Sequence, residues 1–106
     1  MTIQKEIQEQ IEANPVLIYM KGSPDAPECG FSSKACQILI SYGKQFSFVD
    51  ILVNPEIRSN LAKVSDWPTF PQLFIKGELV GGSDIMTELH ENGTLKSLID
   101  SVEVEI

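Results

Sequence analysis

The sequence predicts an α/β fold of one domain, residues 1–106, with a four-stranded mixed sheet flanked by about five helices. Short apolar runs bounded by turn residues alternate with segments of helical periodicity, and this alternation indicates strands between helices. The first two runs, Val16–Met20 and Phe46–Asp50, enclose a helical segment. A strand–helix–strand connection of this kind makes the two strands parallel. The last two runs flank a tight turn at Lys76-Gly77-Glu78, which predicts an antiparallel hairpin.

The first half of the chain contains two predicted helices. Isoleucines recur every four residues over residues 2–13, which predicts an amphipathic helix that ends at Asn14-Pro15. The first strand follows, and after it an irregular loop rich in glycine and proline. Helical spacing resumes from Phe31 to Tyr42, and Gly43 ends that helix in the position where a C-terminal glycine is favoured.

The second half completes the sheet. Asn54-Pro55 opens the third helix, with proline near its first position. The hairpin follows over Gln72–Gly81. Ser83-Asp84 is expected to cap a fourth helix, which Asn92-Gly93 separates from a short last one, and the alternating tail Val102–Ile106 is expected to fray. This order of elements describes a thioredoxin-like fold.

Composition excludes several classes of function. The chain has 8 basic and 15 acidic residues and a net charge of −7, which disfavours nucleic acid and anionic membranes as partners. No apolar run approaches the roughly 20 residues of a membrane helix. The N-terminus lacks the features of a signal peptide. We therefore expect a cytoplasmic protein.

The chemistry of the chain is concentrated between Lys21 and Ser32. Cys29 lies at or just before a helix N-terminus, where unpaired N–H groups and the helix dipole favour a thiolate, and Lys21 adds a positive charge. Ser32 occupies the position where a dithiol redox motif has its second cysteine. Because a hydroxyl cannot resolve a mixed disulfide, Cys29 must react with the thiol of another molecule or bind a ligand.

The other cysteine, Cys36, is expected to be a small structural residue. If both cysteines lie on one helix, their seven-residue spacing separates them by ~10 Å, beyond the ~7 Å limit for a disulfide. Both thiols should then be free, as in a reducing compartment. The two cysteines and the single histidine, His90, do not make a zinc site, because a fourth ligand is missing.

Two further segments fit a binding site near Cys29, at the C-terminal end of the first strand, where α/β sheets place ligands. In Thr69-Phe70-Pro71, a cis bond before Pro71 would leave the backbone free to pair with an extended peptide. Gly81-Gly82-Ser83-Asp84 leads into a helix N-terminus, which suits a carboxylate.

Taken together, the motifs resemble a known family over nearly the whole chain. The chain is similar to the monothiol glutaredoxins of the Cys-Gly-Phe-Ser type, through Lys21, Cys29-Gly-Phe-Ser32, Trp67-Pro68-Thr69-Phe70-Pro71 and Gly81-Gly82-x-Asp84. The resemblance implies a thioredoxin fold, glutathione as a ligand, and a [2Fe–2S] cluster shared by a homodimer. In such a dimer each protomer gives its Cys29 thiolate and two glutathione thiolates complete the four-sulfur set.

The resemblance also assigns binding roles. Lys21 and Arg58 would meet one glutathione carboxylate and the turn Gly82-Ser83-Asp84 the other, while the backbone at Thr69-Phe70, before Pro71, would pair with the cysteine of the tripeptide. Many members have cysteine where this chain has Ser83, so an auxiliary disulfide from that position to Cys29 is excluded here. Family members deliver clusters to iron–sulfur acceptor proteins and pair with BolA-like partners.

Two functions remain open at this point. One is a cluster carrier in iron–sulfur assembly and iron homeostasis. The other is a glutathione-dependent oxidoreductase that removes glutathione from proteins through Cys29. The loop Asp25-Ala-Pro-Glu28 resembles the insertion of the cluster-binding class and favours the carrier, with at most weak oxidoreductase activity. Lys21 and Arg58 are otherwise ordinary surface charges, and Trp67 is either a recognition residue or a packing residue.

Overall fold

A four-stranded mixed sheet forms the centre of the computed structural model, which describes residues 2–104. Its strands are β1 (Val16–Met20), β4 (Ser47–Asp50), β5 (Gln72–Ile75) and β6 (Glu78–Gly81), in the spatial order β4-β1-β5-β6. Strand β1 is parallel to β4 and antiparallel to β5, and β5 and β6 form the antiparallel hairpin. The predicted strand–helix–strand unit and the predicted hairpin are both confirmed.

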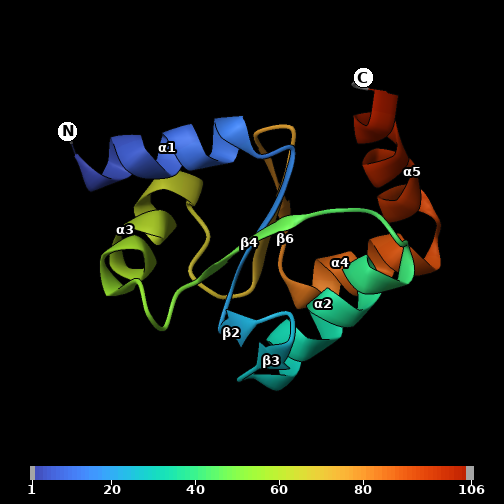
Figure 1. The fold of residues 1–106 in the computed structure, drawn as a ribbon, viewed down its shortest axis with the longest axis horizontal. Coiled ribbons are helices and arrows are strands. Elements are labelled where there is room, and N and C mark those ends of the chain that lie inside the picture. Colours follow the sequence, from blue (N-terminus) through green and yellow to red (C-terminus); the bar gives the residue numbers. More distant parts are fainter. Residues whose placement is uncertain (1, 105–106) are drawn as a thin grey trace.

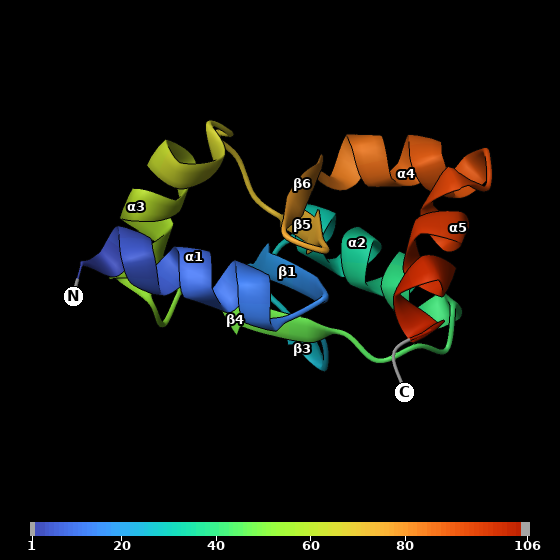
Figure 2. The ribbon, with the colours of Figure 1, turned by 90° about the horizontal axis from the view of Figure 1, so that it is seen from above.

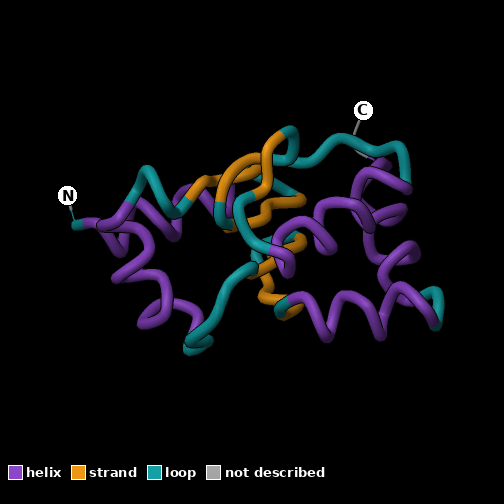
Figure 3. Tube along the Cα trace, turned by 90° about the horizontal axis from the view of Figure 1, so that it is seen from below, coloured by secondary structure: helices purple, strands orange, loops and turns teal. Residues whose placement is uncertain are grey.

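Helices cover both faces of this sheet (Figures 1 and 2). Helices α1 (Ile3–Ala13) and α3 (Pro55–Ser65) pack on one face, and α2 (Gly30–Ser41), α4 (Ser83–Glu91) and α5 (Thr94–Asp100) on the other. Figure 3 shows the same arrangement, with the strands between two groups of helices. The thioredoxin-like fold with five helices is therefore confirmed. Within residues 2–104, no helix has both the length and the apolar character needed to cross a bilayer.

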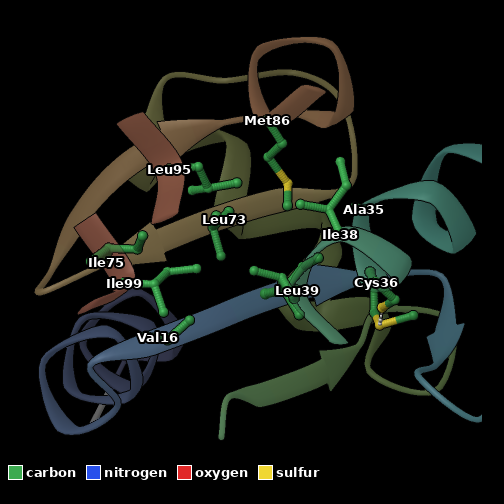
Figure 4. Packing of buried hydrophobic residues seen from close by; sticks show 12 residues of the cluster. Val16, Ala35, Cys36, Ile38, Leu39, Leu73, Ile75, Met86, Leu95 and Ile99 are labelled. Atoms are coloured by element: carbon green, nitrogen blue, oxygen red, sulfur yellow. Dashed lines mark hydrogen bonds between the residues drawn. The ribbon is translucent and has the colours of Figure 1, made fainter. Parts of the chain in front are cut away.

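Strand β1 divides the interior into two cores. All five of its residues are buried, because helices cover it on both sides and strands flank it on both edges. Val16, Ile18 and Met20 face the core under α2, α4 and α5, part of which Figure 4 shows. Leu17 and Tyr19 face the core under α1 and α3. The period-two alternation of a strand thus supplies both cores from one short segment.

Three local predictions differ from the structure. The loop after β1 is not irregular: β2 (Gly22–Ser23) and β3 (Ala26–Pro27) pair as a small antiparallel hairpin, too short to show a sequence pattern. Helix α4 is capped by Gly82, so Ser83 lies inside its first turn and is not the cap. The tail forms a 3-10 helix over Ser101–Val104, and residues 105–106 lie outside the described residues.

Packing of α3 on the sheet gives a stability prediction. Leu61 is fully buried in the core under α1 and α3. Leu61→Ala should lower the free energy of unfolding by about 2–5 kcal/mol, because the lost contacts leave a cavity. The matched change Leu52→Ala, at a side chain that is 41% exposed, should cost less than about 0.5 kcal/mol. Urea unfolding of both variants checks this, and equal losses would contradict the assignment of this core.

Candidate functional site

Cys29 is the N-cap residue of α2. Its backbone is extended, with φ −157° and ψ 138°, and its carbonyl accepts the first helical hydrogen bond from the N–H of Ser33 at 2.9 Å. The residue is partly exposed, whereas the helix that follows it is packed on the sheet. The predicted position of Cys29 at the start of a helix is confirmed.

The environment of Cys29 lowers the pKa of its thiol. The largest cause is a hydrogen bond from the backbone N–H of Ser32, with smaller contributions from the N–H of Phe31, the positive charge of Lys21 and the hydroxyl of Ser32. Partial burial opposes these effects. Unpaired N–H groups at the start of α2 therefore do more to stabilise the thiolate than Lys21 does.

Ser32 has a structural role that the sequence did not reveal. Its side chain is fully buried, and its Oγ accepts a hydrogen bond from the backbone N–H of Lys21 at 3.0 Å. This bond joins the end of β1 to the first turn of α2, on either side of the segment Lys21–Glu28, which we call the thiol loop. The β2–β3 hairpin within this loop lies beside the start of α2 (Figure 1).

Cys36 is chemically unlike Cys29. It is 1% exposed, and burial raises the pKa of its thiol to about 11. Its Sγ lies 3.3 Å from Sδ of Met20, within the core drawn in Figure 4. Both cysteines are free, so the predictions of a structural Cys36 and of no internal disulfide are confirmed.

A pocket of about 470 Å³ opens beside Cys29. It gathers residues from segments that are distant in the sequence. All nine residues predicted for the site line it: Lys21, Cys29, Arg58, Thr69, Phe70, Pro71, Gly82, Ser83 and Asp84. The pocket is also lined by Phe31, Trp67, Pro68 and Ile85, to which the motifs gave no definite role. The structure thus brings together the thiol, two cationic side chains and the N-terminus of α4.

The segment before β5 forms one wall of this pocket. The Phe70–Pro71 bond is cis, as predicted. The fully buried Gln72 anchors the segment, because its Nε2 donates to the carbonyls of Trp67 at 2.8 Å and Thr69 at 3.1 Å. Sequence reasoning missed Gln72, although a polar side chain at the start of an apolar strand was a signal.

Gly82 allows two walls of the pocket to approach each other. A Cβ atom at this position would lie 3.2 Å from the carbonyl oxygen of Pro71 and 3.5 Å from Nε1 of Trp67. The indole Nε1 is itself buried and has no hydrogen-bond partner within residues 2–104. Trp67 is therefore both a packing residue and a lining residue of the pocket.

The charges at the pocket suit an anionic ligand. Lys21 is half-buried and Arg58 is exposed on α3, and Gly82, Ser83 and Asp84 at the N-terminus of α4 also line the pocket. No group of three or more His, Cys, Asp or Glu side chains within residues 2–104 could hold a metal ion. His90 is exposed, and its Nδ1 pairs with the hydroxyl of Tyr42 at 2.5 Å.

Comparison with known proteins places the chain in a family. A family model described as Glutaredoxin matches residues 16–80. Glutaredoxin 4 of Escherichia coli strain K12 is 57% identical over 98 residues, which cover 92% of this chain and 84% of that protein. Glutaredoxin 4 of Buchnera aphidicola subsp. Baizongia pistaciae is 56% identical over 95 residues, which cover 90% and 88%.

Solved structures agree with this result. The solution structure of a monomeric truncated mutant of Trypanosoma brucei 1-C-Grx1 superposes with a TM-score of 0.84 at 40% identity, covering 95% of this chain and 92% of that one. Both the sequence and the fold are thus shared with glutaredoxins. The chain belongs to the glutaredoxin family, and its Cys29-Gly-Phe-Ser32 motif makes it a monothiol member.

Proposed function

We propose that this protein binds glutathione and, as a homodimer, carries a [2Fe–2S] cluster to acceptor proteins in iron–sulfur assembly and iron homeostasis. The observation that carries the proposal is the state of Cys29. This thiol is partly exposed, its pKa is lowered, and it lines a pocket suited to an anionic peptide without a second cysteine in its lining. A thiolate with no thiol partner of its own is ready to coordinate iron.

Glutathione fits the pocket by its charges. It is a small tripeptide with two carboxylates and one thiol, and the glutaredoxin family binds it. Lys21 and Arg58 would bind one carboxylate, and the N–H groups at Gly82, Ser83 and Asp84 the other. The backbone of Thr69 and Phe70, before Pro71, would pair with the peptide in between, which would bring its sulfur next to Cys29.

The donor set explains why a cluster would require two protomers. A [2Fe–2S] cluster is held by four ligands, usually thiolates. One protomer supplies a single suitable thiolate, Cys29, because Cys36 is buried with a raised pKa and the sequence has no third cysteine. Two protomers and two glutathione molecules supply the four sulfurs. Bound there, the cluster would provide labile iron and sulfide for transfer.

The alternative function uses the same thiol as an enzyme. The Cys29 thiolate would attack the glutathione sulfur of a glutathionylated protein, form a mixed disulfide and release the protein thiolate. A second glutathione thiolate would then attack that mixed disulfide, release oxidised glutathione and regenerate Cys29. We favour the carrier because the thiol loop is not a free loop. The β2–β3 hairpin folds it against the start of α2, where the second glutathione thiol would have to reach Cys29.

Partners follow from this function. A cluster bound between two protomers is accessible to iron–sulfur acceptor proteins, and a BolA-like protein could replace one protomer. Two free thiols suit a reducing compartment such as the cytoplasm.

Thiol labelling tests the chemistry assigned to Cys29. At pH 7, iodoacetamide should modify Cys29 alone, because only its thiol has a lowered pKa and access to solvent. Mass spectrometry should find one label on the parent and on Cys36→Ser, and none on Cys29→Ser. As the pH is lowered, the labelling rate of Cys29 should fall off at a lower pH in the folded protein than in urea. The reason is that the folded protein lowers the pKa of this thiol, so the thiolate persists to a lower pH. Labelling of Cys36 in the folded protein would contradict this.

Glutathione binding tests the cationic side of the pocket. Arg58→Ala should weaken binding of reduced glutathione about tenfold, because it removes a charged partner of a carboxylate. Lys63→Ala is the matched control: it removes an exposed charge from the same helix at a residue that does not line the pocket. Trp67, the only tryptophan, allows a fluorescence titration. Equal affinities in the two variants would argue against Arg58 as a ligand.

Anaerobic reconstitution with iron, sulfide and glutathione tests the cluster. The parent and Cys36→Ser should form a dimer with visible absorbance, and Cys29→Ser should remain a colourless monomer with the same circular dichroism. Omission of glutathione should also prevent the dimer. If the parent forms no absorbing dimer and exchanges glutathione disulfides rapidly, the enzyme is the correct function.

A further inference from the structure

The carboxylate of Asp50 connects the thiol loop to the turn that follows β4. Asp50 is the last residue of β4, on the far side of β1 from β5. Its Oδ1 accepts hydrogen bonds from the N–H of Gly22 at 3.0 Å and from the N–H of Leu52 at 2.9 Å. One oxygen atom therefore holds both the start of the thiol loop and the turn that follows β4.

On the side of the thiol loop, this contact is close to Cys29. The carbonyl of Lys21 accepts a hydrogen bond from the N–H of Glu28 at 3.0 Å, which closes the loop directly before Cys29. A Cβ atom at Gly22 would lie 2.5 Å from the carbonyl oxygen of Ala26 and 2.8 Å from the nitrogen of Glu28. The two arms of the loop are in such close contact that a shift of Gly22 must move Glu28 and with it Cys29.

On the other side, Asp50 is linked to Arg58. The Asp50 carbonyl accepts a hydrogen bond from Nδ2 of Asn54 at 2.8 Å. Asn54 is the N-cap residue of α3, but its side chain makes no capping bond and is directed to Asp50 instead. Its carbonyl then accepts from the backbone N–H of Arg58 at 3.1 Å. The side chain of Asp50 thus binds the thiol loop and its main-chain carbonyl binds the N-cap residue of α3, the helix that carries Arg58.

We propose that Asp50 is a positioning residue of the pocket, which fixes the thiol loop relative to the first turn of α3 and so sets the placement of Cys29 relative to Arg58. It touches no ligand itself, since it does not line the pocket. The identity of the ligand rests on the proposed function, whereas the positioning role can be measured on the protein alone.

Amide hydrogen exchange measured by NMR tests the link to the thiol loop. Asp50→Ala removes the acceptor, so exchange at Gly22 and Leu52 should become about tenfold faster than in the parent. Asp50→Asn keeps an acceptor oxygen and should stay within about threefold of the parent. Asp25→Ala removes an exposed carboxylate from the same loop and should leave both amides unchanged. Unchanged exchange in Asp50→Ala, or equally fast exchange in Asp50→Asn, would overturn the proposal.

The pH profile of Cys29 alkylation provides a readout at the site. In Asp50→Ala the midpoint should move to higher pH, because a loosened loop no longer holds Lys21 near the thiol, and Asp50→Asn should restore it. An identical midpoint in all variants would refute the positioning role. Neither experiment uses iron, sulfide or glutathione, so a failed reconstitution leaves both results interpretable.

Asn54→Ala tests the link between Asp50 and α3. It also serves as the test variant if Asp50→Ala does not fold. It removes the side-chain bond from the N-cap residue of α3 to the Asp50 carbonyl and keeps the bond from Gly22 to the Asp50 carboxylate. Exchange at Gly22 should match the parent, while the affinity for reduced glutathione should fall about threefold. An affinity equal to that of the parent would refute the link to Arg58.

Discussion

The fixed position of β1 is the constraint on which the pocket depends. The strand is paired on both edges, and its side chains are buried in two separate cores. The chain therefore leaves the sheet after Met20 at a defined point and in a defined direction. The thiol loop and α2 begin there, and β5, which pairs with β1, brings the cis Phe70–Pro71 segment to the same end. The burial of β1 thus determines the geometry of the pocket at the C-terminal end of this strand.

Backbone groups supply most of the chemistry at this edge. The lowered pKa of Cys29 comes first from the N–H of Ser32, and the charge of Lys21 contributes less. The N-terminus of α4, which also lines the pocket, gives a second set of N–H groups. In a chain of net charge −7, such groups attract an anion without requiring a large basic surface. Dipoles held by helices are also difficult to displace, since each is fixed by the packing of its helix.

The sequence predicted most of the fold because its main signals are periodic. Isoleucines in α1 and the apolar runs of β1 and β5 are long enough to show a pattern, whereas β2 and β3, with two residues each, are not. The nine residues that the joint motifs assigned to a binding site line one pocket. Gln72 and Asp50 were missed because their roles consist of hydrogen bonds to distant backbone groups. Such contacts leave no periodic trace, and only the folded arrangement reveals them.

The buried hydroxyl of Ser32 has a consequence for the evolution of this protein. Its oxygen accepts the N–H of Lys21 within a fully enclosed space. A larger sulfur atom there would be a weaker acceptor, and it would have to be accommodated where strand and helix meet. Gaining a second redox thiol by a single codon change would thus disturb the anchor of the first.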